Sequence, residues 1–203
     1  MRRTAVRSLV IAAAAGSLLS LGVVPASASS TVTVTYPVTG STHIKAINST
    51  LSLGPGTLTS TVNLKTSAVS ASLSLPAATG SFNELGFIPI TATTQFVQDG
   101  AATGTADLTT NKVTVTSQTT LRITKLWVAG LPIPVGRDCQ TRTPASITVT
   151  SQSGFKVLAG GNLAGTYTIP RFSHCGLATP LINLTIPGSG NTITLTLGAA
   201  KLS

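Results

Sequence analysis

Charged side chains are scarce in this chain. They make up 8% of its 203 residues, against about a quarter in an ordinary soluble domain. Acidic residues are the scarcest, and the four carboxylates are Glu84, Asp99, Asp107 and Asp138. A glycosidase needs two carboxylates that face each other across the sugar. The four positions show no spacing that predicts such a pair.

Histidine is almost as rare, with His43 and His174 as its two copies. The patterns His-x-x-x-His and Glu-x-x-His, which bring two metal ligands together, do not occur. The Gly-x-Ser-x-Gly pattern of a nucleophile elbow is also missing. The sequence therefore predicts no catalytic residues, no metal site, no cofactor and no enzyme. A hydrolase that uses His174 is the least favoured alternative.

Long apolar runs are limited to one, at 8–24. Three arginines precede it, a proline ends it, and small residues lead up to Ala28. This order predicts a secretory signal peptide at 1–28, which leaves one secreted domain at 29–203. The general secretion route is favoured, and the twin-arginine route stays open. No later run approaches the roughly 18 apolar residues of a spanning helix, so no integral membrane span is expected.

Cysteine occurs twice, at Cys139 and Cys175. Outside the cell, two thiols with no spare most simply form one disulfide. A crosslink that closes a loop of this length stabilises a domain by roughly 3–4 kcal/mol in the chain-entropy model. The spacing does not match a metal-binding pair, so a structural disulfide is predicted.

Basic residues outnumber acidic ones, but the excess is spread out. Three of the 13 Lys and Arg lie in the signal segment, so ten remain against four carboxylates, a net charge of about +6. The ten do not cluster or alternate with aromatic residues, as they would in a nucleic-acid-binding protein. No nucleic-acid partner is expected, whereas a mild attraction to an anionic envelope surface is reasonable.

Threonine and serine supply the polar side chains instead, and they alternate with apolar residues at a period of two. This pattern is typical of strands with one wet and one buried face. Turn signals between short strands favour an all-β, antiparallel two-sheet β-sandwich, with a β-barrel as the alternative. No segment shows a helical period. The predicted strands are 31–36, 57–64, 68–75, 90–98, 103–108, 112–118, 119–128, 146–151, 165–169, 181–186 and 192–197.

The segment around the two cysteines holds the most varied polar residues. If the disulfide forms, it brings several charged side chains into one neighbourhood, which could bind an anionic group. The alternative is that they only steady irregular loops beside the crosslink. The residues of this candidate polar patch are Arg137, Asp138, Arg142, Arg171 and His174.

The C-terminal third also resembles a group of small secreted actinobacterial proteins with no assigned activity. The residues that carry the resemblance are Cys139-x-Thr141-x-Thr143-Pro144, Gly161, Leu163, Gly165-Thr166-Tyr167-Thr168-Ile169-Pro170-x-Phe172, Cys175-Gly176, Leu181-Ile182-Asn183 and Ile186-Pro187-Gly188-x-Gly190-Asn191-Thr192. The resemblance implies an exported, disulfide-bonded β-domain at or beyond the cell envelope. It carries no catalytic residues over.

These observations predict a secreted, non-enzymatic β-domain that binds an envelope or extracellular partner. Loops near Cys139, Gly176 and 188–190 are the expected contact points, and an exposed strand edge is a second surface. A membrane-inserted β assembly is the alternative, although most predicted strands are shorter than the roughly 9–11 residues that it needs. The oligomeric state and the partner's identity stay open.

Overall fold

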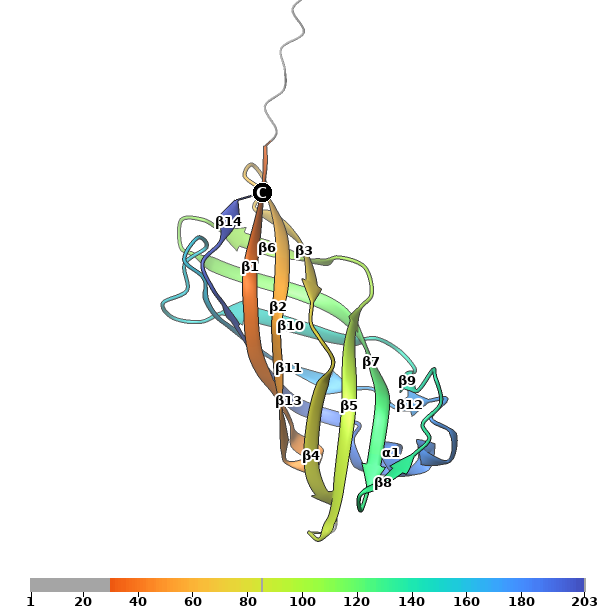
Figure 1. Ribbon diagram of the computed structural model, residues 1–203. Coiled ribbons are helices and arrows are strands. Elements are labelled where there is room, and N and C mark those ends of the chain that lie inside the picture. The colour runs from red at the N-terminus through yellow and green to blue at the C-terminus, as the bar shows by residue number, and fades with distance from the viewer. Residues whose placement is uncertain (1–29, 85, 203) are drawn as a thin grey trace, which may run out of the picture.

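The computed structural model describes residues 30–84 and 86–202, so the predicted signal peptide lies outside the described residues. Strands make up 66% of the structure and helices 8% (Figure 1). Its strands are β1 (Thr31–Ile44), β2 (Ser49–Asn63), β3 (Ala68–Ser74), β4 (Ala78–Glu84), β5 (Ile88–Gln98), β6 (Ala102–Asp107), β7 (Lys112–Val128), β8 (Leu131–Ile133), β9 (Gln140–Thr141), β10 (Ala145–Ser151), β11 (Gly161–Ile169), β12 (Phe172–Ser173), β13 (Gly188–Leu197) and β14 (Lys201–Leu202).

The sheet closes on itself, because β10 pairs with β11 on one edge and with β7 on the other. The ring runs β1-β2-β3-β6-β7-β10-β11-β13 and back to β1, which makes an eight-stranded antiparallel barrel. The all-β prediction is confirmed, but the preferred two-sheet sandwich is not the architecture. The structure has the β-barrel that the sequence predicts as the alternative. Alternation predicts one wet face in both folds, so it could not distinguish them.

Strand β7 explains the closure. The sequence predicts two strands that meet at 118/119, whereas the structure has one strand of 17 residues. One edge of β7 pairs with β6 and then with β5, and the other edge pairs with β10, β9 and β8. A strand of this length can take part in the ring with its first half and support the β4–β5 hairpin with its second half (Figure 1).

The alternation of the sequence sorts the side chains of the barrel. Along β1, the apolar residues Val34, Tyr36 and Val38 are buried inside. Thr33 and Thr35, which alternate with them, face outward, and Thr33 bonds Thr61 of β2 through their side chains at 3.0 Å. Similar hydroxyl pairs join other neighbouring strands on the outer surface. The β-branched threonines thus favour the strands and keep the outer surface wet without charge.

Two predictions about elements are wrong or incomplete. The segment predicted as a strand at 181–186 belongs to the helix α1 (Thr179–Thr185), which follows the short 3-10 helix η2 (Gly176–Ala178). Ala178, Ile182 and Ile186 are buried at intervals of four residues, which is a helical period. It is hidden in the sequence by the apolar alternation at 181–186. Strand β4 was not predicted, because its residues include a glycine and few apolar side chains.

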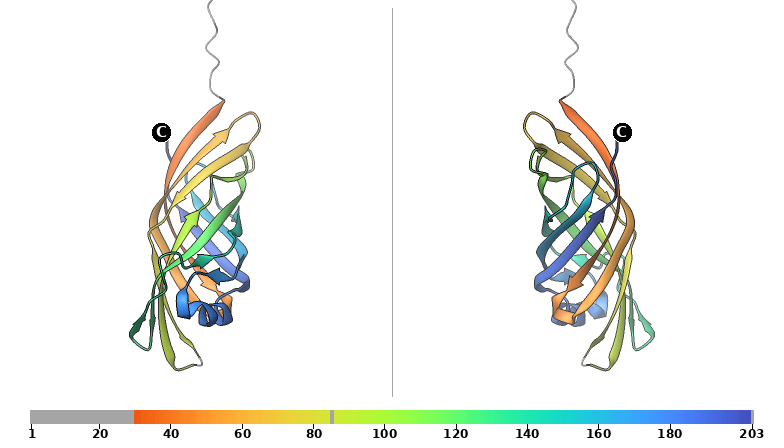
Figure 2. Two further views of the ribbon diagram at one scale, coloured as in Figure 1. Left: turned by 90° about the vertical axis from the view of Figure 1, so that its right-hand side faces the viewer. Right: turned by 90° about the vertical axis from the view of Figure 1, so that its left-hand side faces the viewer.

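The two ends of the barrel differ. At the lower end, α1 and η2 lie beside the 3-10 helix η1 (Lys45–Ile47), and Ile182 and Ile186 join the core (Figure 2). At the upper end, where β1 begins and the β2–β3 hairpin turns, the loop at 152–160 folds over the rim. Tyr36 donates a hydrogen bond to the Val157 carbonyl at 2.7 Å, and Asn111 accepts one from the Val157 amide at 3.1 Å.

Candidate functional site

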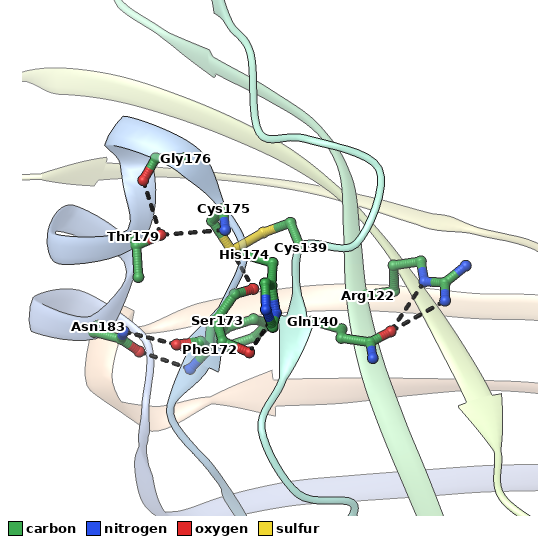
Figure 3. The surroundings of a disulfide bond; sticks show 10 residues. All are labelled: Arg122, Cys139, Gln140, Phe172, Ser173, His174, Cys175, Gly176, Thr179 and Asn183. Carbon is green, nitrogen blue, oxygen red and sulfur yellow. Dashed lines mark hydrogen bonds between the residues drawn. A yellow bond between two sulfur atoms is a disulfide. The ribbon is translucent and has the colours of Figure 1, made fainter.

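The disulfide between Cys139 and Cys175 is present, as the sequence predicts, and both residues are fully buried (Figure 3). It joins the segment before β9 to the segment between β12 and η2. The Thr179 hydroxyl accepts a hydrogen bond from the Cys175 amide at 3.1 Å and donates one to the Gly176 carbonyl at 2.9 Å. The Asn183 side chain bonds both the amide and the carbonyl of Phe172, at 2.7 and 2.9 Å. The crosslink and these bonds hold α1 against the barrel.

The structure brings the backbone of the candidate polar patch together in two places. The carbonyl of His174 lies against Gly136, so that 136–138 and 174–175 are neighbours. The Arg142 amide donates to the Arg171 carbonyl at 2.8 Å. The main chain therefore brings 137–138 near His174 and Arg142 near Arg171, in two separate places.

The side chains of the patch make few contacts. All five are exposed, and the His174 ring bonds Ser173 at 3.1 Å. Within 30–84 and 86–202, Asp138 forms no ion pair with an arginine. None of the five lines any of the three hollows described below. The patch as an anion site stays a prediction.

One surface hollow does involve a predicted loop. A groove of about 540 Å³ lies where β10 begins, β11 ends and β13 begins. Ser189 and Gly190, from the loop at 188–190, line it together with Ser146 and Thr166. Its wall consists of hydroxyls, prolines and backbone, without a charged side chain. This composition offers hydrogen bonds but no feature that selects a particular ligand.

The most distinctive hollow lies inside the upper half of the barrel. Its volume is about 110 Å³, and its wall is almost wholly aliphatic and aromatic. No Asp, Glu, Lys, Arg or His lines it. The residues that contribute most of the wall are Leu58, Val62, Val69, Leu73, Phe96, Val113, Val115, Ile147, Val149, Phe155, Leu163, Ile193, Leu195 and Leu197.

Small side chains on adjacent strands account for this cavity. Ala71 of β3 and Ala102 and Ala106 of β6 face inward, and Gly104 stands between the two alanines of β6. Strand β13 lies four places from β6 in the ring, on the opposite wall, and its larger inward residues include Ile193 and Leu195. They do not span the gap that the small wall leaves. An eight-stranded barrel is just wide enough either to be filled by side chains or to hold one small ligand.

The polar groups in the wall are nearly all satisfied. Gln98 donates to the Ala71 carbonyl at 2.8 Å and accepts from the Leu73 amide at 2.7 Å. Ser117 and Thr119 bond each other at 3.0 Å. Ser60 has no hydrogen-bond partner among the described residues, and its hydroxyl keeps a small accessible surface in the cavity wall. The cavity therefore presents one free hydroxyl within an apolar surface.

A smaller cavity of about 40 Å³ lies below the first one, and Phe96 lines both. It sits where β2 and β4 pack without a hydrogen-bonded ladder; there Ser49 donates to the Ser81 carbonyl at 3.1 Å. Ile47 and Ile186 close it from the lower end. Closure by helices below and a loop above leaves the upper cavity as the main interior space.

Within the described ranges, no cluster of three or more His, Cys, Asp or Glu could hold a metal ion. The His43 ring bonds Thr50 at 3.1 Å, and no carboxylate accepts a hydrogen bond from either histidine in the part of the chain that is described. None of the helices found in that part has the length and apolar character to cross a membrane.

Comparisons with known proteins give no family for the chain. No family model matches it, and no curated protein and no solved structure is similar enough to count as a match. The resemblance of the C-terminal third to secreted actinobacterial proteins therefore stays a prediction. The class of the protein rests on its own geometry, which is a disulfide-bonded β-barrel with an apolar interior cavity.

Sequence reasoning missed this cavity. The available signal was the run 102–106, whose inward positions are all Ala or Gly, next to Ala71 on the neighbouring strand. That signal becomes informative only once β3 and β6 are known to be adjacent.

Proposed function

We propose that this chain is a secreted, non-enzymatic binding protein that takes a small apolar molecule, or the end of a hydrocarbon chain, into the upper half of its barrel. The observation that carries the proposal is the apolar cavity of about 110 Å³. Its size is of the same order as the engineered apolar cavity of about 150 Å³ that stays dry and binds benzene.

The energetics of an empty cavity support this proposal. Unfilled space in a core costs about 24 cal/mol per Å³, so a void of this size costs roughly 2–3 kcal/mol. A single larger residue at one of the three alanine positions would remove much of that cost. A ligand that fills the space offsets the cost while it is bound, because it restores the missing dispersion contacts.

The outer surface favours a barrel that works in water. Outward positions on the strands carry hydroxyls, which pair across neighbouring strands. A membrane-inserted assembly would need apolar side chains at those positions. Binding of an envelope partner through the loops near the disulfide stays a second prediction, and the groove beside 188–190 is its best-placed surface.

The test combines benzene with a variant that fills the cavity. Titration of the protein with benzene should shift the methyl resonances of Ala71, Ala102 and Ala106 in ¹H–¹³C NMR spectra. The Ala106→Leu variant should lose at least tenfold in benzene affinity, because its side chain occupies the space. Its free energy of unfolding should equal or exceed that of the parent.

The matched control is Thr105→Leu, which adds a similar side chain on the outer face of the same strand. This control should bind benzene like the parent. The proposal fails if benzene leaves the alanine methyls unchanged. It also fails if Ala106→Leu destabilises the protein by the roughly 1–3 kcal/mol expected for overpacking a filled core.

A further inference from the structure

The upper rim of the barrel carries a pattern that the cavity alone does not explain. Four loops or ends lie toward this end of the barrel, namely the β2–β3 turn, the β6–β7 turn, the loop at 152–160 and the segment at 198–202 (Figure 1). Each presents a leucine to solvent. The four are Leu64, Leu108, Leu158 and Leu202, with exposed fractions of 51%, 45%, 65% and 74%.

A lysine accompanies each of these leucines. Lys65, Lys112, Lys156 and Lys201 lie within four residues of the leucine in the same loop or end, and all four are exposed. The described carboxylate at this rim is Asp107, which stands opposite Lys112 in the β6–β7 ladder. Exposed leucines with a lysine nearby in each loop are complementary to an anionic bilayer, where leucines enter the acyl boundary and lysines meet the headgroups.

The cavity reaches the same rim. Val62, Ala106 and Val113, which line it, each precede or follow a rim turn by one or two residues. Phe155 and Val157 line it from the loop at 152–160. A molecule that leaves a bilayer at this rim would therefore reach the apolar wall by passing the loop at 152–160.

We propose that the upper rim docks on the surface of an anionic lipid bilayer and that the cavity receives its apolar ligand from that surface. The second half of this inference rests on the proposed function, whereas docking depends on the rim residues alone. The lower end also has exposed apolar residues, including Leu177 and Leu184. It lacks the lysine beside each leucine, so it serves as the internal control.

The experiment measures sedimentation of the protein with sucrose-loaded vesicles in 0.1 M NaCl. One set contains phosphatidylcholine alone and the other contains 30% phosphatidylglycerol. Binding should be strong only with the second set and should weaken as salt rises. The Leu64→Ser/Leu158→Ser variant should lose at least tenfold in vesicle affinity, whereas Leu177→Ser/Leu184→Ser should bind like the parent.

The charge contribution is tested separately. Lys65→Gln and Lys156→Gln should each lower the affinity for the phosphatidylglycerol vesicles about fivefold. Lys125→Gln, an exposed lysine on the second half of β7, should leave it unchanged. Every variant is also titrated with benzene, which should bind to all of them with parental affinity.

Three results would overturn the docking proposal: equal binding to both vesicle types, equal loss in the rim and lower-end variants, or self-association of the protein through the rim leucines on gel filtration. Failure of benzene binding with intact vesicle binding would instead remove the proposed function and leave docking in place. The two claims are therefore distinguishable.

Discussion

Among single residues, Asn191 makes the most concentrated set of buried contacts. It is 1% exposed. Its side-chain oxygen accepts a hydrogen bond from the Lys45 backbone amide at 3.0 Å. Its side-chain nitrogen donates hydrogen bonds to the backbone carbonyls of Gly188 at 2.8 Å and Tyr167 at 3.3 Å. One amide thereby joins η1, β11 and the start of β13 at the lower end of the barrel. The sequence showed Asn191 only as part of a resemblance.

Replacing Asn191 should cost much more than replacing an exposed asparagine. Asn191→Ala removes three hydrogen bonds to buried backbone groups, so the free energy of unfolding should fall by about 2–4 kcal/mol. Asn162→Ala, which removes one exposed bond to Thr196, should cost under about 0.5 kcal/mol. Urea denaturation measures both. Equal effects of the two substitutions would contradict the role given to Asn191.

The two tyrosines predict how stability depends on pH. Burial raises the pKa of Tyr36 and of Tyr167 above the ordinary value near 10, although the Thr42 hydroxyl at 2.7 Å partly lowers that of Tyr167. Below pH 10 the phenols are neutral in both states, and their contribution to stability is fully present. Above pH 10 the unfolded chain loses these protons first. The free energy of unfolding should therefore fall as the pH rises through the folded pKa values.

Urea titrations between pH 8 and 11 measure this slope. Tyr167→Phe should lower stability at pH 8, because it removes the bond to Thr42, and should flatten the fall above pH 10. A variant with the same slope as the parent would show that Tyr167 does not titrate differently in the two states.

At the scale of elements, α1 depends on tertiary contacts. It has seven residues, which is too short to be stable alone in water. The disulfide beside it and the hydrogen bonds between Asn183 and Phe172 stabilise the helix in place of a longer helical hydrogen-bond ladder. This dependence explains why local sequence favoured a strand at 181–186, where β-branched residues and an apolar alternation are also present.

Removing the crosslink should show this dependence. The Cys139→Ala/Cys175→Ala variant should lose about 3–4 kcal/mol in free energy of unfolding, since the two cysteines are 36 residues apart. Hydrogen exchange should increase most in α1 and β12. Uniform acceleration across the barrel, with no excess at α1, would contradict a local role for the disulfide.

At the scale of the whole molecule, the sequence predicts the all-β class, most strands and the disulfide. Those features depend on local alternation and on cysteine count. Closure into a barrel depends on β10 meeting β7, and the cavity depends on Ala71 and Ala106 facing the large residues of β13. These relations join residues far apart in the chain, so no local pattern expresses them. The leucines and lysines of the four rim segments also come from distant parts of the chain, so no local pattern predicts that they lie at one end of the barrel.

The upper half of the barrel holds an apolar cavity, and we propose that it accepts a small molecule. A crystal structure determined under xenon pressure tests it most directly, because xenon enters dry apolar cavities. We expect a xenon atom inside the barrel beside Ala71, Ala102 and Ala106, and none at that position in crystals of the Ala106→Leu variant. A barrel filled by its own side chains, with no xenon at that position, would contradict it.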